Sequence, residues 1–281
     1  MSNALAPCRL SVFLALEAPI GVILRRGPSE WAQLIRWNRK TDTFEPGQWF
    51  HGRVYERRCD VSPDGRLFIY FASKQTVRQD NDNVGGAWTA ISRPPYFTAL
   101  ALWRNLGTWY GGGVFKTNRD VLLDVTCNLD SHEKFPPRGL RFARCPADSA
   151  PWEQRLLQHQ WQLQERGFHP RTHMRLGQRE IWCKPDRASR VMLFREVEDV
   201  DFRRYGGPYG DTYWLETYTD IVPLSGVTWA DWEGGERLAL VRDGKLIQGQ
   251  WDGSALSESE LFDGNRLTPI EVAPPDWAQR W

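Results

Sequence analysis

Residues 55–70 read Tyr-Glu-Arg-Arg-Cys-Asp-Val-Ser-Pro-Asp-Gly-Arg-Leu-Phe-Ile-Tyr, and this stretch decides the fold class. Its centre, Ser-Pro-Asp-Gly at 62–65, is a turn signal, because Gly accepts the positive φ that a tight turn needs. Apolar and aromatic residues flank the turn, as is typical of strands. The stretch therefore predicts a strand, a tight turn and a second strand.

The same pattern recurs along the whole chain of 281 residues. Short apolar stretches, rich in β-branched and aromatic residues, alternate with Gly, Pro, Asn or Asp. Asp243-Gly244 is a second strong turn signal, residues 39–47 read as a hairpin connection, and Leu10 to Leu24 reads as two strands. An all-β fold follows.

One segment departs from this pattern. Residues 151–167 have high helix propensity, with apolar residues recurring at intervals of three to five. Ser149 can cap the start, Pro151 suits a first turn and Gly167 can close the end. We expect one helix inserted between strands and lying against the rim of a sheet.

A loose repeat connects these strands. Residues 227–240 match the opening stretch in placing an Asp before a Gly turn and an apolar run after it, and 99–115 and 201–215 are worn versions. The intervals are irregular, about 40 to 60 residues, in the range of propeller and solenoid repeats.

The Ser-Pro-Asp-Gly turn with the following Arg-Leu-Phe-Ile-Tyr resembles the turn that joins the first two strands of a blade in WD-repeat and Tol-type β-propellers. A Gly-His start and a Trp-Asp end in each repeat, which mark the WD subclass, are absent. The resemblance implies a five- or six-bladed β-propeller over residues 1–281, as a single domain into which the helix expected at about 151–167 is inserted. In such a ring, sheets that are apolar on both faces bury one another. A β-sandwich with insertions is the alternative.

Composition excludes several classes of protein. Apolar residues make up 41% of the chain, which is enough for a large core, and no run approaches the roughly 20 apolar residues of a membrane helix. Leu10 to Leu24 is broken by Glu17 and Pro19, so it does not read as a secretion signal. Five Cys without a C-x-x-C pair argue against a disulfide scaffold or zinc knuckle. We expect a cytoplasmic protein.

No catalytic or cofactor motif stands out. His169, His173 and Cys183 have a spacing that metal sites use, but Pro170 opposes the helix that would align the two rings. The Gly-Gly-Gly at 111–113 lacks the Lys of a phosphate loop and reads as a strand start that needs close packing. We expect no metal, no cofactor and no enzymatic activity.

Three carboxylates keep a carbohydrate-active enzyme or lectin open as an alternative. Asp60, Asp201 and Asp231 lie near predicted strand starts, where propeller glycosidases carry acidic residues around a central funnel. Hydrolysis would need two of them about 5 Å or about 6.5–9.5 Å apart. An Asp beside a turn more often hydrogen-bonds the local backbone.

Two clusters combine Arg with aromatic residues at Gly-rich turns. Their members are Trp103, Arg104, Trp109 and Tyr110 in the first, and Arg203, Arg204, Tyr205 and Tyr209 in the second. This mixture is enriched at protein interfaces, although strand packing covered by Arg stems would look the same. The leading hypothesis is a non-enzymatic scaffold or protein-interaction module that binds another protein and no membrane.

Charge supports a third hypothesis. Residues 1–200 carry 29 Lys and Arg against 21 Asp and Glu, whereas 201–281 carry 7 against 14, and the basic excess is concentrated at 138–195. A basic region can bind nucleic acid. Two faces of one domain neutralising each other is the alternative interpretation.

Overall fold

A computed structural model describes residues 7–27, 30–74, 86–124, 129–146, 149–168, 178–186, 190–199, 209–233 and 237–281. The chain divides into two compact units, namely unit 1 (Met1–His159 with Arg266–Trp281) and unit 2 (Gln160–Asn265). Each unit is described by itself, and the assignment of 1–281 to a single domain stays a prediction.

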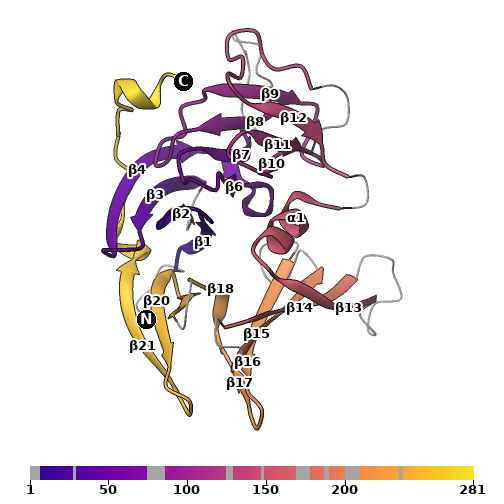
Figure 1. Cartoon of the computed structure of the whole chain (residues 1–281). Helices are drawn as coiled ribbons and strands as arrows, with labels where there is room; N and C mark the ends of the chain where they lie inside the picture. Colours follow the sequence, from indigo (N-terminus) through magenta and orange to yellow (C-terminus); the bar gives the residue numbers. More distant parts are fainter. Residues whose placement is uncertain are drawn as a thin grey trace, which may run out of the picture. The chain divides into compact units, whose positions relative to one another are not determined.

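The strands of unit 1 form three sheets in chain order (Figure 1). The first sheet contains β1 (Arg9–Leu14), β2 (Ile20–Arg26), β3 (Trp31–Asn38) and β4 (Thr43–His51). The second contains β5 (Arg53–Val54), β6 (Asp60–Val61), β7 (Phe68–Ser73), β8 (Ala87–Ser92) and β9 (Ala101–Asn105), with the 3-10 helix η1 (Glu56–Arg58) between β5 and β6. The third contains β10 (Gly113–Phe115), β11 (Asp120–Leu123) and β12 (Arg141–Arg144). The 3-10 helix η3 (Asp276–Ala278) also belongs to this unit.

The strands of unit 2 form two further sheets. The fourth contains β13 (Gln162–Phe168), β14 (Gln178–Pro185), β15 (Met192–Asp199), β16 (Tyr209–Glu216) and β17 (Ile221–Pro223). The fifth contains β18 (Val227–Trp232), β19 (Arg237–Arg242), β20 (Lys245–Trp251) and β21 (Leu256–Asp263), followed by η2 (Gly264–Arg266).

Neighbouring strands are antiparallel in all the described pairs except β11 with β12, which are parallel. Each sheet is built from consecutive strands and forms one blade. The chain is thus an all-β five-bladed β-propeller with one short helix. The predicted fold class is confirmed with five blades rather than six, and the β-sandwich alternative is wrong.

The second sheet shows why one blade needs neighbours. Every residue of β7 is buried, so the strand is apolar on both faces. Phe68 and Tyr70 belong to a core shared with the first sheet, where Phe68 meets Phe13 edge to face. Ile69, from the opposite face of the strand, joins Phe115 of the third sheet in a second core. Because successive side chains of β7 point to opposite faces of the second sheet, this one strand packs against both the first and the third sheet.

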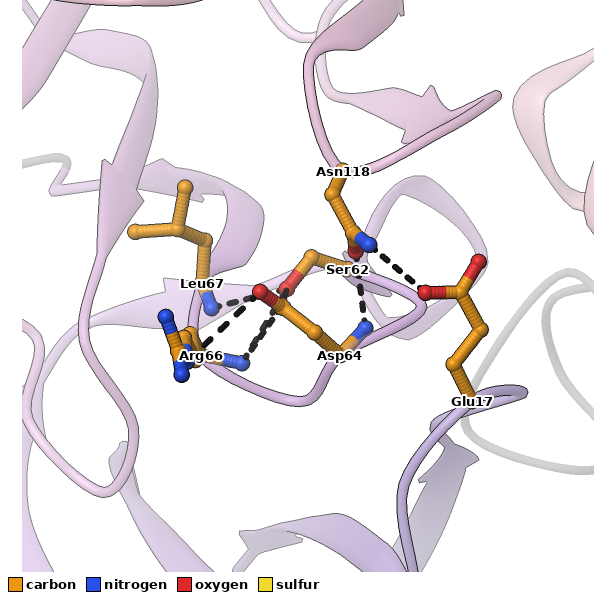
Figure 2. A network of polar contacts seen from close by, with 6 residues as sticks. All are labelled: Glu17, Ser62, Asp64, Arg66, Leu67 and Asn118. Atoms are coloured by element: carbon orange, nitrogen blue, oxygen red, sulfur yellow. Dashed lines mark hydrogen bonds and ion pairs between the residues drawn. The ribbon is translucent and has the colours of Figure 1, made fainter.

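The Ser-Pro-Asp-Gly turn joins β6 to β7 as the resemblance implied, and Figure 2 shows how it is held. Ser62 Oγ donates to Asp64 Oδ1 at 2.6 Å and accepts the backbone N–H groups of Arg66 and Leu67. A Cβ on Gly65, whose φ is +73°, would lie 2.7 Å from Ile20 Cβ. The turn is thus closed by its own side chains and by close approach of β2.

Asn118, in the turn between β10 and β11, connects this turn to the two flanking sheets. Its Oδ1 accepts the N–H of Asp64 at 2.8 Å, and its Nδ2 donates to Glu17 Oε2, in the β1–β2 connection, at 2.7 Å (Figure 2). The N–H of Glu17 donates to the carbonyl of Pro63 at 2.8 Å. One amide side chain therefore links all three sheets of unit 1.

We expect Asn118→Ala to destabilise the protein by about 1–2 kcal/mol, because the Asp64 N–H and the Glu17 carboxylate lose their shared partner. Urea unfolding measures this change. Lys116→Ala, at an exposed position of the same turn, is the control and should leave the midpoint unchanged. Equal midpoints for the two variants would contradict the role assigned to Asn118.

Other predicted turns are confirmed. Asp243 and Gly244 connect β19 to β20 with φ of +52° and +74°, and the flanking Arg242 and Lys245 pair directly. Two successive positive φ values are those of a two-residue type I′ hairpin. The connection predicted over 39–47 is confirmed only for residues 39–42, because residues 43–47 already belong to β4. The predicted pair of strands between Leu10 and Leu24 is β1 and β2.

The predicted helix is present but shorter than 151–167. Helix α1 spans Pro151–Gln158, Pro151 lies in its first turn as expected, and it packs against β10 and η1. Gln160 has φ +65°, after which β13 pairs with β14. Pairing with β14 satisfies the backbone of β13 and overrides its helix propensity. No helix among the described residues is long and apolar enough to cross a membrane.

The predicted caps of the helix are wrong. Ala150 occupies the N-cap position and offers no side-chain hydrogen bond, while Ser149 Oγ accepts from Gln154 Nε2 at 2.9 Å. Gly167 lies inside β13 instead of closing the helix. The helix is attached by its side chains: Arg155 places its guanidinium 4.8 Å from the centre of the Phe13 ring and donates to the carbonyl of Cys59.

Candidate protein-interaction site

The connection between β9 and β10 in unit 1 carries the most concentrated exposed apolar surface of the described residues. Leu106 is 96% exposed, Trp109 86% and Tyr110 53%. We refer to residues 106–110 as the Trp109 loop. Apolar side chains exposed singly are common, but three within five consecutive residues need an explanation.

Two hydrogen bonds from Arg58 hold the backbone of the Trp109 loop. Arg58 Nη1 donates to the carbonyl of Thr108 at 2.7 Å and its Nη2 donates to the carbonyl of Trp109 at 2.8 Å. The same guanidinium lies 5.1 Å from the centre of the Phe71 ring and 5.5 Å from that of Tyr55. Arg58, at the end of η1, is thus fixed by two rings and fixes two residues of the loop in turn.

A second set of hydrogen bonds closes the base of the loop. Thr89 Oγ1 donates to Asn105 Oδ1 at 3.1 Å and accepts the N–H of Gly112 at 2.7 Å. Gly111 N donates to Asp124 Oδ2 at 3.2 Å. Burial raises the pKa of the Asp124 carboxyl, while the Gly111 hydrogen bond and the Arg58 charge lower it.

The three glycines that follow the Trp109 loop pack closely, as predicted for a strand start. A Cβ on Gly111 would lie 2.3 Å from the Phe71 ring, one on Gly112 2.0 Å from the carbonyl oxygen of Arg58, and one on Gly113 2.3 Å from that of Leu122. Distances below 3.0 Å leave no room for a side chain. The loop therefore emerges from a tightly packed base.

The first predicted cluster divides between the core and the surface. Trp103 is 1% exposed, its Nε1 donates to the carbonyl of Leu129 at 3.0 Å, and its ring contacts Phe142. It belongs to the core between the second and third sheets. Arg104, Trp109 and Tyr110 are exposed. The packing interpretation therefore holds for Trp103, and only the other three remain available to a partner.

The second predicted cluster cannot be placed in the same way. Arg203, Arg204 and Tyr205 lie outside the described residues. Tyr209 begins β16, where only its backbone is described. Binding at this cluster stays a prediction.

Asp60, one of the three carboxylates considered for catalysis, lies on β6 and is 3% exposed. Its Oδ2 accepts the N–H of Phe115 at 2.8 Å. Burial raises its pKa to about 7, against the opposing effects of the Arg155 charge and backbone hydrogen bonds from Phe115 and Val61. The thiol of neighbouring Cys59, also buried, has its pKa raised to about 12. Asp60 is thus engaged inside unit 1.

Asp231 lies in unit 2 and is engaged there. Its Oδ1 forms an ion pair with Lys184 Nζ at 2.6 Å, and its Oδ2 accepts from Trp161 Nε1 at 3.4 Å. Asp201 lies outside the described residues. Convergence of the three carboxylates in one funnel stays a prediction.

The basic region 138–195 is extensively paired. Arg141 binds Asp120 through two nitrogens, at 2.6 and 2.8 Å. Four further cations of the region pair with carboxylates, in the pairs Arg166–Glu180, Arg179–Glu196, Lys184–Asp231 and Arg195–Asp211. Five of the twelve Lys and Arg in this region are thus paired with carboxylates of the chain, and nucleic-acid binding through the region stays a prediction.

Of the three residues with metal-ligand spacing, only Cys183 lies in the part of the chain that the structure describes. His169 and His173 lie outside the described residues, and Cys183 is a buried free thiol. Within the described ranges, no three His, Cys, Asp or Glu side chains gather closely enough to hold a metal ion.

Sequence reasoning missed the residues that shape the loop. Leu106 lies two positions after the predicted Arg104, and its place in an Asn-Leu-Gly turn was the available signal. Arg58 lies 50 residues from Thr108, and Thr89 lies 23 residues from Gly112 just after the loop, so only tertiary structure brings these residues together.

The fold and the Trp109 loop together define a β-propeller protein with one loop of exposed apolar side chains. No protein-family model matches the chain, and no curated protein matches it. Among solved structures, the chain is similar to the β-propeller domain of the Trilobed protease from Pyrococcus furiosus, described as having an open velcro topology. The identity is 9% and the TM-score 0.33, over 93% of this chain and 100% of that one.

An uncharacterised protein from Listeria monocytogenes EGD-e is similar at 8% identity and a TM-score of 0.31, over 91% of this chain and 66% of that one. Similarities of this size carry no argument about the activity of this chain.

Proposed function

We propose that this chain is a non-enzymatic protein-interaction module, and that the Trp109 loop is the element that binds another protein. The observation behind the proposal is an exposed Trp, 86% accessible, on a backbone anchored by Arg58. Trp and Tyr are the residue types that contribute most to the binding energy of protein interfaces. A cytoplasmic location is part of the proposal, in line with the four described cysteines, which are all free thiols.

The fixed backbone of the Trp109 loop favours binding, because exposed apolar side chains bind better when they are held in one conformation. Ordering a flexible loop on association costs free energy, so a loop already held in one conformation binds more tightly for the same contacts. Arg58 and Thr89 supply that order before any partner arrives. A Trp side chain adds large contact area with only two rotatable bonds.

The two other hypotheses have less support. A carbohydrate-active site would use Asp60 or Asp231, and both are buried and already bonded inside their own units. Nucleic-acid binding would use the 138–195 region, in which five cations are paired with carboxylates.

The test is capture of a partner by variants that differ only in loop surface. We expect Trp109→Ala to lose a binding protein that the unchanged chain retains from its host lysate, with an affinity loss of about 2 kcal/mol or thirtyfold. The matched control is Tyr218→Ala, because Tyr218 is fully exposed at a hairpin tip of unit 2.

Quantitative mass spectrometry of the captured proteins reads out both variants. A crosslinkable phenylalanine at position 109 then identifies what touches the loop. If Trp109→Ala captures the same proteins in the same amounts as Tyr218→Ala, the loop is not the binding element.

A further inference from the structure

We propose that the segment bound by the Trp109 loop is an acidic stretch of protein that also carries an apolar side chain. This inference rests on the proposed function and adds the chemistry of the partner. It follows from the charges that surround the loop in unit 1.

Four cations lie at the end of the second sheet from which the loop emerges. They are Arg53 on β5, Arg58 on η1, Lys74 just after β7 and Arg104 on β9. The strand register places Arg53 opposite Ser73, Ser73 opposite Ala87 and Ala87 opposite Asn105, so these elements end together. Arg53 also stacks on the Tyr55 ring that Arg58 uses, at 4.8 Å from its centre.

The carboxylates of this region that the structure describes already have partners. Glu56 forms an ion pair with Arg26, and Asp124 accepts the N–H of Gly111 beside Arg58. Glu30, on the neighbouring sheet, lies 3.5 Å from His51. Within the described ranges no carboxylate pairs with Arg53, Lys74 or Arg104, and all three are exposed. Among the described residues, the loop therefore lies beside three exposed cations, Arg53, Lys74 and Arg104, that have no carboxylate partner.

Such cations select a partner by charge. Cations at the rim of an interface attract an acidic segment and accelerate its association, while apolar contacts at the centre of the interface slow its dissociation. Leu106 and Trp109 provide that centre. A nucleic acid would match the cations but leave the side chain of Leu106, 96% exposed, without an apolar counterpart.

The experiment is selection from a random 12-residue peptide library displayed on phage, with the full chain as bait and the Trp109→Ala variant for counter-selection. We expect the enriched peptides to share a net negative charge and at least one Leu, Phe or Trp. The strongest synthetic peptide is then titrated against the variants by fluorescence polarisation.

The charge variant is Arg53→Gln with Arg104→Gln, and the matched control is Lys116→Gln with Arg119→Gln, an exposed pair on the β10–β11 turn. We expect the first variant to weaken binding about tenfold at 50 mM salt and to flatten its salt dependence, and the control to change neither.

The outcomes separate the two proposals. Enriched peptides that depend on Trp109 but carry no acidic bias overturn the acidic partner and leave the interaction module standing. Absence of any peptide that depends on Trp109 overturns both. A labelled 20-nucleotide single strand that binds through Arg53 and Arg104 with equal strength would instead assign the charges to nucleic acid and overturn the inference.

Discussion

Replacing Gly112 with Ala is expected to destabilise the protein by about 3 kcal/mol or more. The added Cβ would lie 2.0 Å from the carbonyl oxygen of Arg58 and 2.6 Å from its Cβ. Overpacking of this kind costs about 1–3 kcal/mol, and the φ of +86° adds about 1–2 kcal/mol for any residue with a Cβ. The nearest atom is a backbone oxygen, and the position of the Arg58 Cβ is fixed by the backbone, so a rotamer change cannot relieve the clash.

The same substitution should also disturb the binding loop, since the displaced residue is the one that holds Thr108 and Trp109. Gly107→Ala is the matched control: it lies in the same loop, its φ is not positive and no atom lies within 4 Å of the added Cβ. Thermal and urea unfolding of both variants measure the difference. A Gly112→Ala protein as stable as Gly107→Ala would show that the base of the loop is not packed as described.

Replacing Asp60 with Asn is expected to remove a large pH dependence of stability. The pKa of this carboxyl rises from 3.8 to about 7 because burial disfavours the charged form. The folded state therefore holds a proton that the unfolded state has lost between these two pH values. Stability from this group is complete below pH 3.8 and is lost as pH rises through about 7.

The size of this effect follows from the shift of the pKa. At 1.36 kcal/mol for each pKa unit, the shift corresponds to about 4 kcal/mol between pH 4 and pH 8. Asn has the same shape, keeps an oxygen for the N–H of Phe115 and cannot ionise. Asp60→Asn should therefore match the unchanged protein near pH 4 and exceed it above pH 7.

Urea unfolding midpoints at intervals from pH 4 to pH 8.5 measure this divergence. Asp276→Asn is the control, because that carboxylate is 89% exposed and should leave the profile unchanged. Parallel profiles for Asp60→Asn and the unchanged chain would mean that Asp60 is ionised in the fold throughout this range.

The sequence predicted correctly those turns whose conformation depends on residues adjacent in the chain. The turns at 62–65 and 243–244 form where Gly supplies a positive φ and where Ser62 and Asp64 hydrogen-bond their own backbone. The helix, in contrast, was predicted nine residues too long at its end, because residues 162–168 pair with β14 instead. Helix propensity in that stretch is a weaker influence than a strand partner.

The candidate site was predictable only in part. Trp109 and Tyr110 were identified because they crowd a Gly-bearing turn, and both are exposed. Trp103 was grouped with them, yet it is buried because strand alternation turns it toward Phe142 of the third sheet. Which face of a strand meets a neighbouring sheet depends on register and sheet order, which distant residues determine.

By itself, the amino-acid sequence determined the all-β class, the tight turns and the glycines that require close packing, because each of these depends on residues adjacent in the chain. Tertiary structure decided the number of blades, the end of the helix, and the hydrogen bonds from Arg58 to the backbone of the Trp109 loop. Those features depend on contacts between residues far apart in the chain, such as Arg58 and Trp109, which are 51 positions apart. Such contacts leave no periodic trace in the sequence.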